Sequence, residues 1–259
     1  RYLAEITYFD GQVGEALSLL DKYNLTDNTL VIVVSEQGAS FPFGKWTCYD
    51  TGLQSAFIAR WPGRIPAGAV SDALIEYSDI LPTFVEAAGG TPDPILDGKS
   101  LLPVLFGEKQ IHKEYVFGEM TTRGINDGSD YYGIRSVRSK QFKYVRNFTP
   151  EATFKNACVE SDIFQSGIKA AEAGNSDAAD KVKRYQHRPE EELYDVVKDP
   201  YEWNNLADNP EYADVKKEMR TALIQWMEAM GDKGQQTELE AFEHQAGKRA
   251  AKRKGAADE

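Results

Sequence analysis

The first twenty residues repeat apolar positions with the period of an amphipathic helix. Apolar side chains recur three or four residues apart, at Ile6, Phe9, Val13, Leu17 and Leu20. A turn containing Asn and Asp follows, and residues 30–34 (Leu-Val-Ile-Val-Val) form an unbroken apolar run. Such a run is typical of a parallel strand that is buried on both faces of a sheet. The pattern therefore predicts a helix, a short loop and a buried strand, which together make an α/β unit.

Two further elements extend this α/β region. Residues 55–61 form a second apolar stretch that a Pro-Gly pair closes, and we predict a strand there. Ser78 is a suitable N-cap for a helix that passes through residues 81–85 and ends at a Gly-Gly pair. The helical periodicity starts at the beginning of the chain, and neither a Met nor a signal peptide precedes it. We therefore expect the chain to be the C-terminal part of a longer protein.

The pattern changes near residue 110, beyond which the predicted strands are short. We predict a strand at residues 115–117 and an antiparallel hairpin whose strands, residues 132–137 and 142–145, flank a Ser-Lys turn. The polar, Ala-rich stretch 160–188 is expected to be an insertion, either helical or loose.

A helix near the carboxyl end should cover this second sheet. Asn209 precedes a Pro at the expected helix start, an apolar stripe follows, and Gly231 ends it. The fold class is therefore α/β, with a mixed sheet flanked by helices in residues 1–110 and a smaller antiparallel sheet with a packed helix in residues 111–235. Residues 236–259, which end in a basic stretch rich in Ala and Gly, are expected to be a flexible tail.

Composition narrows the classes of protein. The 259 residues include 30 Lys and Arg against 41 Asp and Glu, so the formal net charge is −11, and 41% of them are hydrophobic, which is enough for a core. The acidic balance argues against a nucleic-acid or anionic-membrane partner. No apolar run approaches the ~18 residues of a membrane helix. The two cysteines match no zinc spacing.

Three side chains near the end of the first strand are candidates for chemistry. Glu36 and Gln37 follow the strand directly, and ligands of open α/β sheets gather at the carboxyl ends of the strands. A carboxylate beside an amide oxygen offers two hard ligands suited to Ca²⁺ or Mg²⁺, although a polar pair can also simply end a strand. Lys45, eight residues after Gln37, could bind an anion or donate a proton, or it could be a solvated surface lysine.

Read together and in order, the motifs of this chain resemble the second half of the sulfatase family. The strand ends in Ser-Glu-Gln-Gly where that family has Ser-Asp-His-Gly or Ser-Asp-Asn-Gly, and a Gly-Lys loop and a Trp-Pro-Gly follow. The Ser-Glu-Gln-Gly variant and the sequence of residues 41–50 are similar to the heparan N-sulfatase-like branch. The matching segments are residues 8–14, 28–38, 44–50, 61–63, 77–83, 96–103, 192–195, 199–200 and 204–206.

The resemblance implies an alkaline-phosphatase-like fold and roles for the residues after the strand. Glu36 and Gln37 occupy the positions of a metal-ligand pair, with Ca²⁺ the expected ion and Mg²⁺ the alternative. Lys45 occupies the position of a lysine that contacts the sulfate. Because Glu is one methylene longer than the family's Asp, the ion would be shifted or the loop adjusted.

Substrate choice is expected to come from loops of the second region. Thr122 and Arg123 follow the strand at residues 115–117, and an arginine there could grip a carboxylate or a second sulfate bidentately. An exposed loop arginine without a ligand is the alternative. His187 and Arg188 form a similar but weaker candidate for substrate binding.

The family's nucleophile is a formylglycine made from Cys or Ser in a Cys/Ser-x-Pro-x-Arg motif, and neither Cys48 nor Cys158 lies in one. The resemblance therefore implies that the formylglycine belongs to a missing N-terminal part of the same protein, which would be a partner of this chain. It also implies that this chain alone is inactive, and that the protein is secreted or periplasmic.

The leading hypothesis is a hydrolase of sulfuric esters or sulfamates that acts on a sulfated oligosaccharide or polysaccharide. One alternative is a phosphodiesterase or phosphonate hydrolase of the same superfamily; these enzymes usually hold transition metals through several His and Asp ligands, and only three His occur here. Another is a non-catalytic glycan-binding relative. A third is adhesion of the basic tail to a polyanion.

Overall fold

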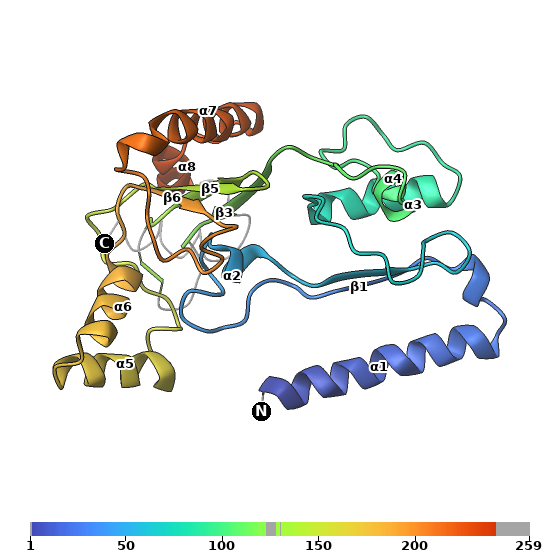
Figure 1. The fold of residues 1–259 in the computed structure, drawn as a ribbon, viewed down its shortest axis with the longest axis horizontal. Helices are drawn as coiled ribbons and strands as arrows, with labels where there is room; N and C mark the ends of the chain where they lie inside the picture. The colour runs from blue at the N-terminus through green and yellow to red at the C-terminus, as the bar shows by residue number, and fades with distance from the viewer. Residues whose placement is uncertain (1, 123–127, 130, 242–259) are drawn as a thin grey trace, which may run out of the picture. The chain divides into compact units, whose positions relative to one another are not determined.

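The contacts in the computed structural model divide the protein into two compact units (Figure 1). The structure describes residues 2–122, 128–129 and 131–241. The first unit contains the residues up to Glu36 together with Ser55–Val116. The second contains Gln37–Gln54 and the described residues from Phe117 onward. The loop 37–54 therefore belongs with the carboxyl-terminal part of the chain, although it leaves and rejoins the first unit in sequence.

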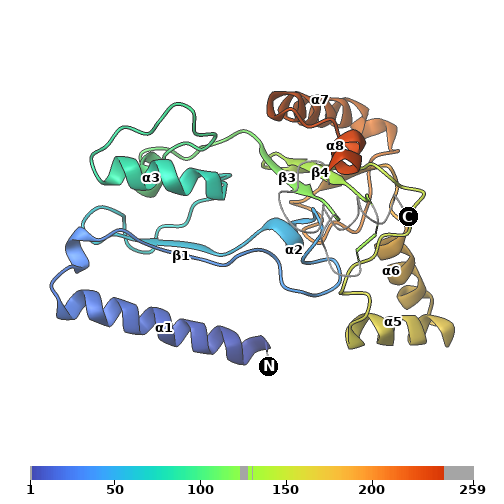
Figure 2. The same ribbon diagram turned by 180° about the vertical axis from the view of Figure 1, so that it is seen from behind.

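The first unit is a two-stranded antiparallel sheet with helices on both sides. The strand β1 (Val31–Val34) pairs with β2 (Phe57–Arg60), with Val31 opposite Arg60 and Val34 opposite Phe57. In Figures 1 and 2 the long α1 runs along one side of this sheet and α3 lies on the other. The helical elements of this unit are α1 (Tyr2–Lys22), η1 (Thr26–Asn28), η2 (Tyr77–Asp79), α3 (Ile80–Ala87) and α4 (Leu102–Leu105).

Two expectations about this unit are wrong. All four residues of β1 are half-buried rather than buried on both faces, and the partner strand β2 is antiparallel. The predicted N-cap of α3 is also wrong. The backbone N–H of Glu76 donates to the carboxylate of Asp79 at 2.8 Å, and the side chain of Ser78 makes no cap. Asp79 is fully buried and also accepts from the N–H of Lys99 and from the ammonium group of Lys113, both at 2.8 Å.

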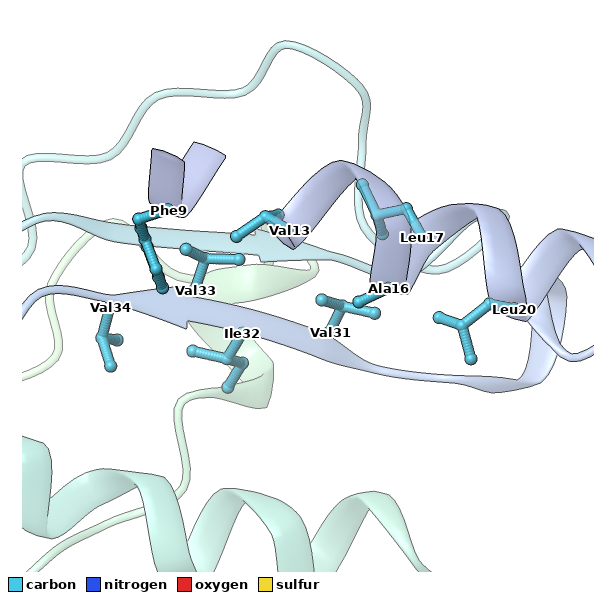
Figure 3. Close-up of a pocket in the computed structure, with 9 residues that line it drawn as sticks. All are labelled: Phe9, Val13, Ala16, Leu17, Leu20, Val31, Ile32, Val33 and Val34. Carbon is cyan, nitrogen blue, oxygen red and sulfur yellow. The ribbon is translucent and has the colours of Figure 1, made fainter. Parts of the chain in front are cut away.

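The apolar face of α1 is the one that the sequence predicts. It faces β1, but a pocket remains between the two elements. Figure 3 shows the side chains from α1 and β1 that line an apolar pocket of about 400 Å³. No residue of α1 is buried, and Ile6 and Phe9 remain 49% and 50% exposed. The lining residues are Phe9, Val13, Ala16, Leu17, Leu20, Val31, Ile32, Val33 and Val34.

The second unit is built on a four-stranded sheet in the order β3-β4-β5-β6. The predicted hairpin, short strand and covering helix are confirmed. Two adjacent antiparallel pairs set the register, with Ser136 opposite Val145 and Val145 opposite Glu192, and α7 packs on β4 and β5 (Figure 2). The elements are α2 (Asp50–Leu53), β3 (Val116–Met120), β4 (Ile134–Arg138), β5 (Phe142–Asn147), α5 (Asp162–Glu172), α6 (Ser176–Gln186), β6 (Glu191–Asp195), η3 (Pro210–Tyr212), α7 (Ala213–Met230) and α8 (Gln235–Glu240).

Local capping explains where the helices of this unit begin and end. The side chain of Asn209 accepts from the N–H of Glu211 at 3.0 Å at the start of η3, and Gly231 ends α7 in the left-handed conformation at φ 71°. Ser161 and Asn175 cap α5 and α6 in the same way. The insertion expected at residues 160–188 is therefore helical, and none of the helices described is long and apolar enough to cross a membrane.

The core of the second unit gathers side chains from the sheet, the α5–α6 pair and the loop 37–54. Its largest members are fully buried aromatic residues that meet edge to face, such as Tyr132 and Phe154 at 5.1 Å between ring centres. The buried cluster is Cys48, Met120, Tyr132, Ile134, Val145, Phe154, Cys158, Val159, Phe164 and Tyr185.

The expectation of a flexible tail is wrong at its start, because residues 236–240 belong to the helix α8. Glu238 of α8 is buried and accepts from the guanidinium of Arg135 on β4 at 2.9 Å. A Cβ at Gly133 would lie 2.6 Å from the Glu238 side chain, so a larger residue at this position would displace that side chain. This pair holds α8 on the sheet.

Candidate active-site loop

The loop 37–54 folds back on itself so tightly that three of its glycines are sterically required. The N–H of Gly38 donates to the carbonyl of Gly52 at 2.9 Å, and a Cβ at Gly38 would lie 2.0 Å from the Thr51 carbonyl. A Cβ at Gly44 would lie 2.5 Å from the carbonyl of Ala39, and one at Gly52 would meet the Gly44 carbonyl at 2.6 Å. The two ends of the loop are therefore in direct backbone contact, and its turn has one closely packed arrangement.

Lys45 sits at this turn between two aromatic residues that adopt the left-handed conformation. Phe43 and Trp46 have φ values of 64° and 66°, which is costly for side chains of this size and is found where the surrounding structure over-determines the backbone. The hydroxyl of Thr47 donates to the carbonyl of Gly44 at 2.7 Å. The N–H of Lys45 donates to the carbonyl of Ala39 at 2.9 Å. Its side chain is half-buried, and Nζ lies 5.4 Å from the centre of the Trp46 ring.

Buried charges anchor the loop on the sheet of the second unit. The carboxylate of Asp50 accepts from Lys143 at 2.7 Å and from Arg138 at 2.9 Å, and its N–H donates to Glu202 at 2.6 Å. Burial favours the neutral acid, but Lys143 and Arg138 outweigh it and hold the pKa of Asp50 below its usual value. Removing either partner of such a buried pair leaves an uncompensated charge.

Aromatic rings and two arginines surround the other end of the turn. The Phe43 ring lies 5.2 Å from the rings of both Tyr185 and Trp203. The guanidinium of Arg184 lies 4.3 Å from the centre of the Trp203 ring and 5.5 Å from that of Phe43. Arg188 is buried, with its guanidinium 3.9 Å from the centre of the Phe154 ring. The contacts of Phe43 with Arg184 and Tyr185 pack the turn against α6.

Glu36 and Gln37 follow β1 after Ser35, and both side chains are exposed. Their donor atoms are the hard oxygens that Ca²⁺ prefers, so the residues fit such an ion chemically. Ca²⁺ takes about 6–8 oxygen ligands, however, and no group of three or more His, Cys, Asp or Glu suited to a metal occurs within the described residues. The pair would be a partial set of ligands.

The candidate substrate-binding residues have different environments. Thr122 is buried, and its hydroxyl accepts from the N–H of Tyr132 at 2.9 Å, which gives it a structural contact. His187 is exposed at the carboxyl end of α6. Arg123 lies outside the described residues.

The two cysteines are free and buried. Burial raises the pKa of the Cys48 thiol to about 11, against the smaller opposing influence of Lys143 and Arg135. A thiol with that pKa is almost entirely protonated near neutral pH, and it is a poor nucleophile. Cys48 is a core residue of the second unit.

The residues that hold the Lys45 turn were missed by sequence reasoning. Tyr49 and Asp50 lie within the family-like segment 44–50. No sequence pattern, however, pairs Asp50 with Lys143 or Glu202, from which it is separated by 93 and 152 residues. The hydroxyl of Tyr49 similarly donates to Glu192 at 2.8 Å across 143 residues. The local signal was limited to an acidic residue, Asp50, at the start of a short helix.

Comparison with known proteins identifies the relatives of this chain. The family model for N-sulphoglucosamine sulphohydrolase, C-terminal, matches residues 38–156. An ulvan-active sulfatase of Formosa agariphila is 38% identical over 231 residues, which are 89% of this chain and 43% of that protein. The N-sulphoglucosamine sulphohydrolase of Homo sapiens is 30% identical over 230 residues, which are 84% of this chain and 45% of that protein.

A solved structure shares the fold. A protein in complex with its substrate D-glucosamine-2-N,6-O-disulfate matches with a TM-score of 0.68 at 23% identity, over 90% of this chain and 41% of that one. This chain thus spans less than half the length of the relatives it matches. The predicted fold class and the resemblance carried by the sequence motifs are both confirmed. The chain belongs to the sulfatase family and corresponds to its C-terminal portion, in the heparan N-sulfatase-like branch.

Proposed function

We propose that this chain forms part of a sulfatase that hydrolyses sulfuric esters or sulfamates of a sulfated saccharide, with Lys45 contacting the sulfate. The observation that carries the proposal is the closed loop that presents Lys45, in a chain of this family. Its relatives point to the same class of substrate, since they include an ulvan-active sulfatase and an N-sulphoglucosamine sulphohydrolase.

Lys45 contributes positive charge at a fixed place. Its backbone N–H is bonded to the carbonyl of Ala39, and Phe43 and Trp46 beside it are in the left-handed conformation, so the turn from which the side chain extends is fixed before an anion binds. An ammonium group beside a sulfuryl group stabilises the charge that develops on the oxygens, and it can donate a proton to the leaving oxygen or nitrogen. Electrostatic stabilisation of this kind is usually the largest single contribution to catalysis.

Glu36 and Gln37 would hold a divalent cation, with Ca²⁺ the first choice and Mg²⁺ the second. A bound cation supplies further positive charge to the sulfuryl oxygens. The two side chains contribute a carboxylate and an amide oxygen, and the remaining ligands would come from a part of the protein that precedes this chain. We place the formylglycine nucleophile in that same part, so the 259-residue chain alone is expected to release no sulfate. Its compartment would be the periplasm or the exterior of the cell.

Replacing Lys45 with Ala in the complete enzyme should lower kcat/KM by roughly 10²–10³-fold, as the loss of one preorganised donor does. Initial rates on ulvan oligosaccharides and on N-sulfated glucosamine would measure this and would separate O-sulfate from N-sulfate substrates. Lys155→Ala is the matched control, because that lysine is an exposed residue of the same unit. An unchanged kcat/KM for the Lys45 variant would remove it from the site.

The metal assignment is tested by calcium itself. Titration with Ca²⁺ should raise the melting temperature of the complete enzyme, and Glu36→Ala should abolish most of that rise, because ligand binding stabilises the folded state. Glu114→Ala serves as a control for the loss of one acidic side chain. Equal calcium responses of wild type and Glu36→Ala would show that the Glu-Gln pair binds no metal.

A further inference from the structure

Glu202 is a fully buried carboxyl group that takes no part in the chemistry proposed for Lys45, Glu36 and Gln37. It follows β6 by seven residues and has a left-handed backbone at φ 56°. Its N–H donates to the carbonyl of Asp199 at 3.0 Å, and its own carbonyl accepts from the guanidinium of Arg184. A strained, solvent-inaccessible glutamate of this kind persists only where neighbouring contacts hold it.

The Glu202 side chain is aimed at the start of α2. Its Oε2 accepts from the backbone N–H of Asp50 at 2.6 Å, and its Oε1 lies 3.6 Å from Nζ of Lys143. Asp50 is the first residue of α2, and the preceding Tyr49 makes no side-chain cap. The first N–H groups of a helix lack partners within the helix. Glu202 therefore supplies, from 152 residues away, the acceptor that a local capping residue would ordinarily provide.

The residues of α2 in turn support the Lys45 turn. The hydroxyl of Thr51 donates to the carbonyl of Phe43 at 2.5 Å, and the carbonyl of Gly52 accepts from the N–H of Gly38 at 2.9 Å. Gly38 is adjacent to Ala39, whose carbonyl accepts from the N–H of Lys45. A continuous series of contacts thus runs from the carboxyl group of Glu202 to the backbone of Lys45.

We propose that Glu202 is a positioning residue for Lys45, which acts by fixing the start of α2 and thereby the turn that presents the lysine. Because its side chain has no exposed surface, Glu202 acts on Lys45 through the turn. The effect of the turn on catalysis rests on the proposed function, whereas the effect of Glu202 on the turn can be measured without any reaction.

Two variants separate the hydrogen bond from the charge. Glu202→Gln keeps the length of the side chain and an acceptor for the Asp50 N–H but removes the charge. Glu202→Asp keeps the charge but withdraws it by one methylene, so that the bond to Asp50 is lost. Glu238→Asp is the matched control, because Glu238 is also a buried carboxylate of the second unit and accepts hydrogen bonds from Arg135 and Thr121.

Amide hydrogen exchange of the full 259-residue chain, read at Gly38 and Lys45, measures the turn directly. We expect exchange at both amides to rise by about tenfold in Glu202→Asp, as a local opening would produce, and to stay near wild type in Glu202→Gln and Glu238→Asp. Wild-type protection in Glu202→Asp would overturn the proposal. So would an equal loss of protection in Glu202→Gln, since charge rather than the hydrogen bond would then be the cause.

Kinetics of the complete enzyme extends the test to function. Glu202→Asp should lower kcat/KM on the order of tenfold, because small displacements of a catalytic group are costly, and Glu202→Gln should restore most of it. Failure of the proposed function has a different signature, namely an unchanged kcat/KM in Lys45→Ala while the exchange pattern remains as expected. Equal kcat/KM for Glu202→Asp and wild type, with Lys45→Ala impaired, would refute the positioning role alone.

Discussion

The two units bury their apolar side chains to very different extents. In the second unit, Tyr132, Phe154 and Tyr185 have no exposed surface. In the first, α1 has no buried residue, and every residue of β1 is only half-buried. The sequence of α1 nevertheless carries a regular apolar stripe at Ile6, Phe9, Val13, Leu17 and Leu20. Periodicity therefore identifies which face of an element is apolar, but it does not say how completely that face is covered.

Both units compensate the carboxylates that they bury, but with partners of different kinds. In the first unit, backbone N–H groups of Glu76 and Lys99 and the Lys113 ammonium group surround Asp79. In the second, Asp50 is paired with side chains from two strands of the sheet. The first arrangement ties a turn to groups 20 and 34 residues further along the chain, whereas the second joins a loop to a sheet 88 and 93 residues away. Only the second kind can make a site depend on the packing of a whole unit.

The largest expected effect is the loss of a core ring in the second unit. Phe154→Ala should lower the free energy of unfolding of that unit by about 4 kcal/mol, because it leaves a cavity next to Tyr132 and Tyr185 and removes the ring under the Arg188 guanidinium. Urea titration followed by tryptophan fluorescence measures this, since Trp46, Trp203 and Trp226 lie in this unit. A decrease of less than about 1 kcal/mol in the free energy of unfolding would show that Phe154 is not tightly packed in this core.

A smaller effect is the pH dependence that Glu202 gives to the second unit. Burial raises the pKa of Glu202 to about 7, and the nearby Asp50 and Glu192 carboxylates add to this while Lys143 opposes it. The folded state therefore binds the proton more tightly than the unfolded state. The resulting stability is fully present below the unfolded pKa, near 4.5, and is lost as the pH rises through about 7.

Glu202→Gln cannot ionise and should escape this loss. Relative to wild type, its urea midpoint should rise between about pH 5 and about pH 8. Asp50 contributes in the opposite direction, because its lowered pKa stabilises the fold above the unfolded value, and that stability is lost as the pH falls. A wild-type-like pH dependence in Glu202→Gln would contradict the assignment.

The smallest expected effect is the truncation of an apolar side chain in the first unit. Phe9→Ala should lower the local stability of α1 by only about 1 kcal/mol, because half of the ring is exposed and it borders an existing pocket. Hydrogen exchange of peptides from residues 2–22 would report this. A loss as large as that of Phe154→Ala would mean that α1 closes against β1 far more tightly than the pocket indicates.

Most secondary structure of this protein could be predicted, and most of the contacts around its site could not. The hairpin at residues 132–145 and the start of the helix after Asn209 follow from turn and capping residues close together in sequence. The antiparallel pairing of β1 could not be inferred, because an apolar run of this length suits either direction. The candidate Lys45 was found from its motif, but its supports Glu202 and Lys143 carry no local signal.

The sequence by itself determined the family, the order of the elements and the loop on which the candidate lysine lies, because these depend on short-range patterns. Only the tertiary structure decided that residues 37–54 belong with the second unit, and that Asp50 meets Lys143 and Glu202 there. The physical reason is that a buried carboxylate needs a partner at hydrogen-bond distance, whichever part of the chain supplies it. Folding brings together groups 152 residues apart, and that distance leaves no pattern along the chain.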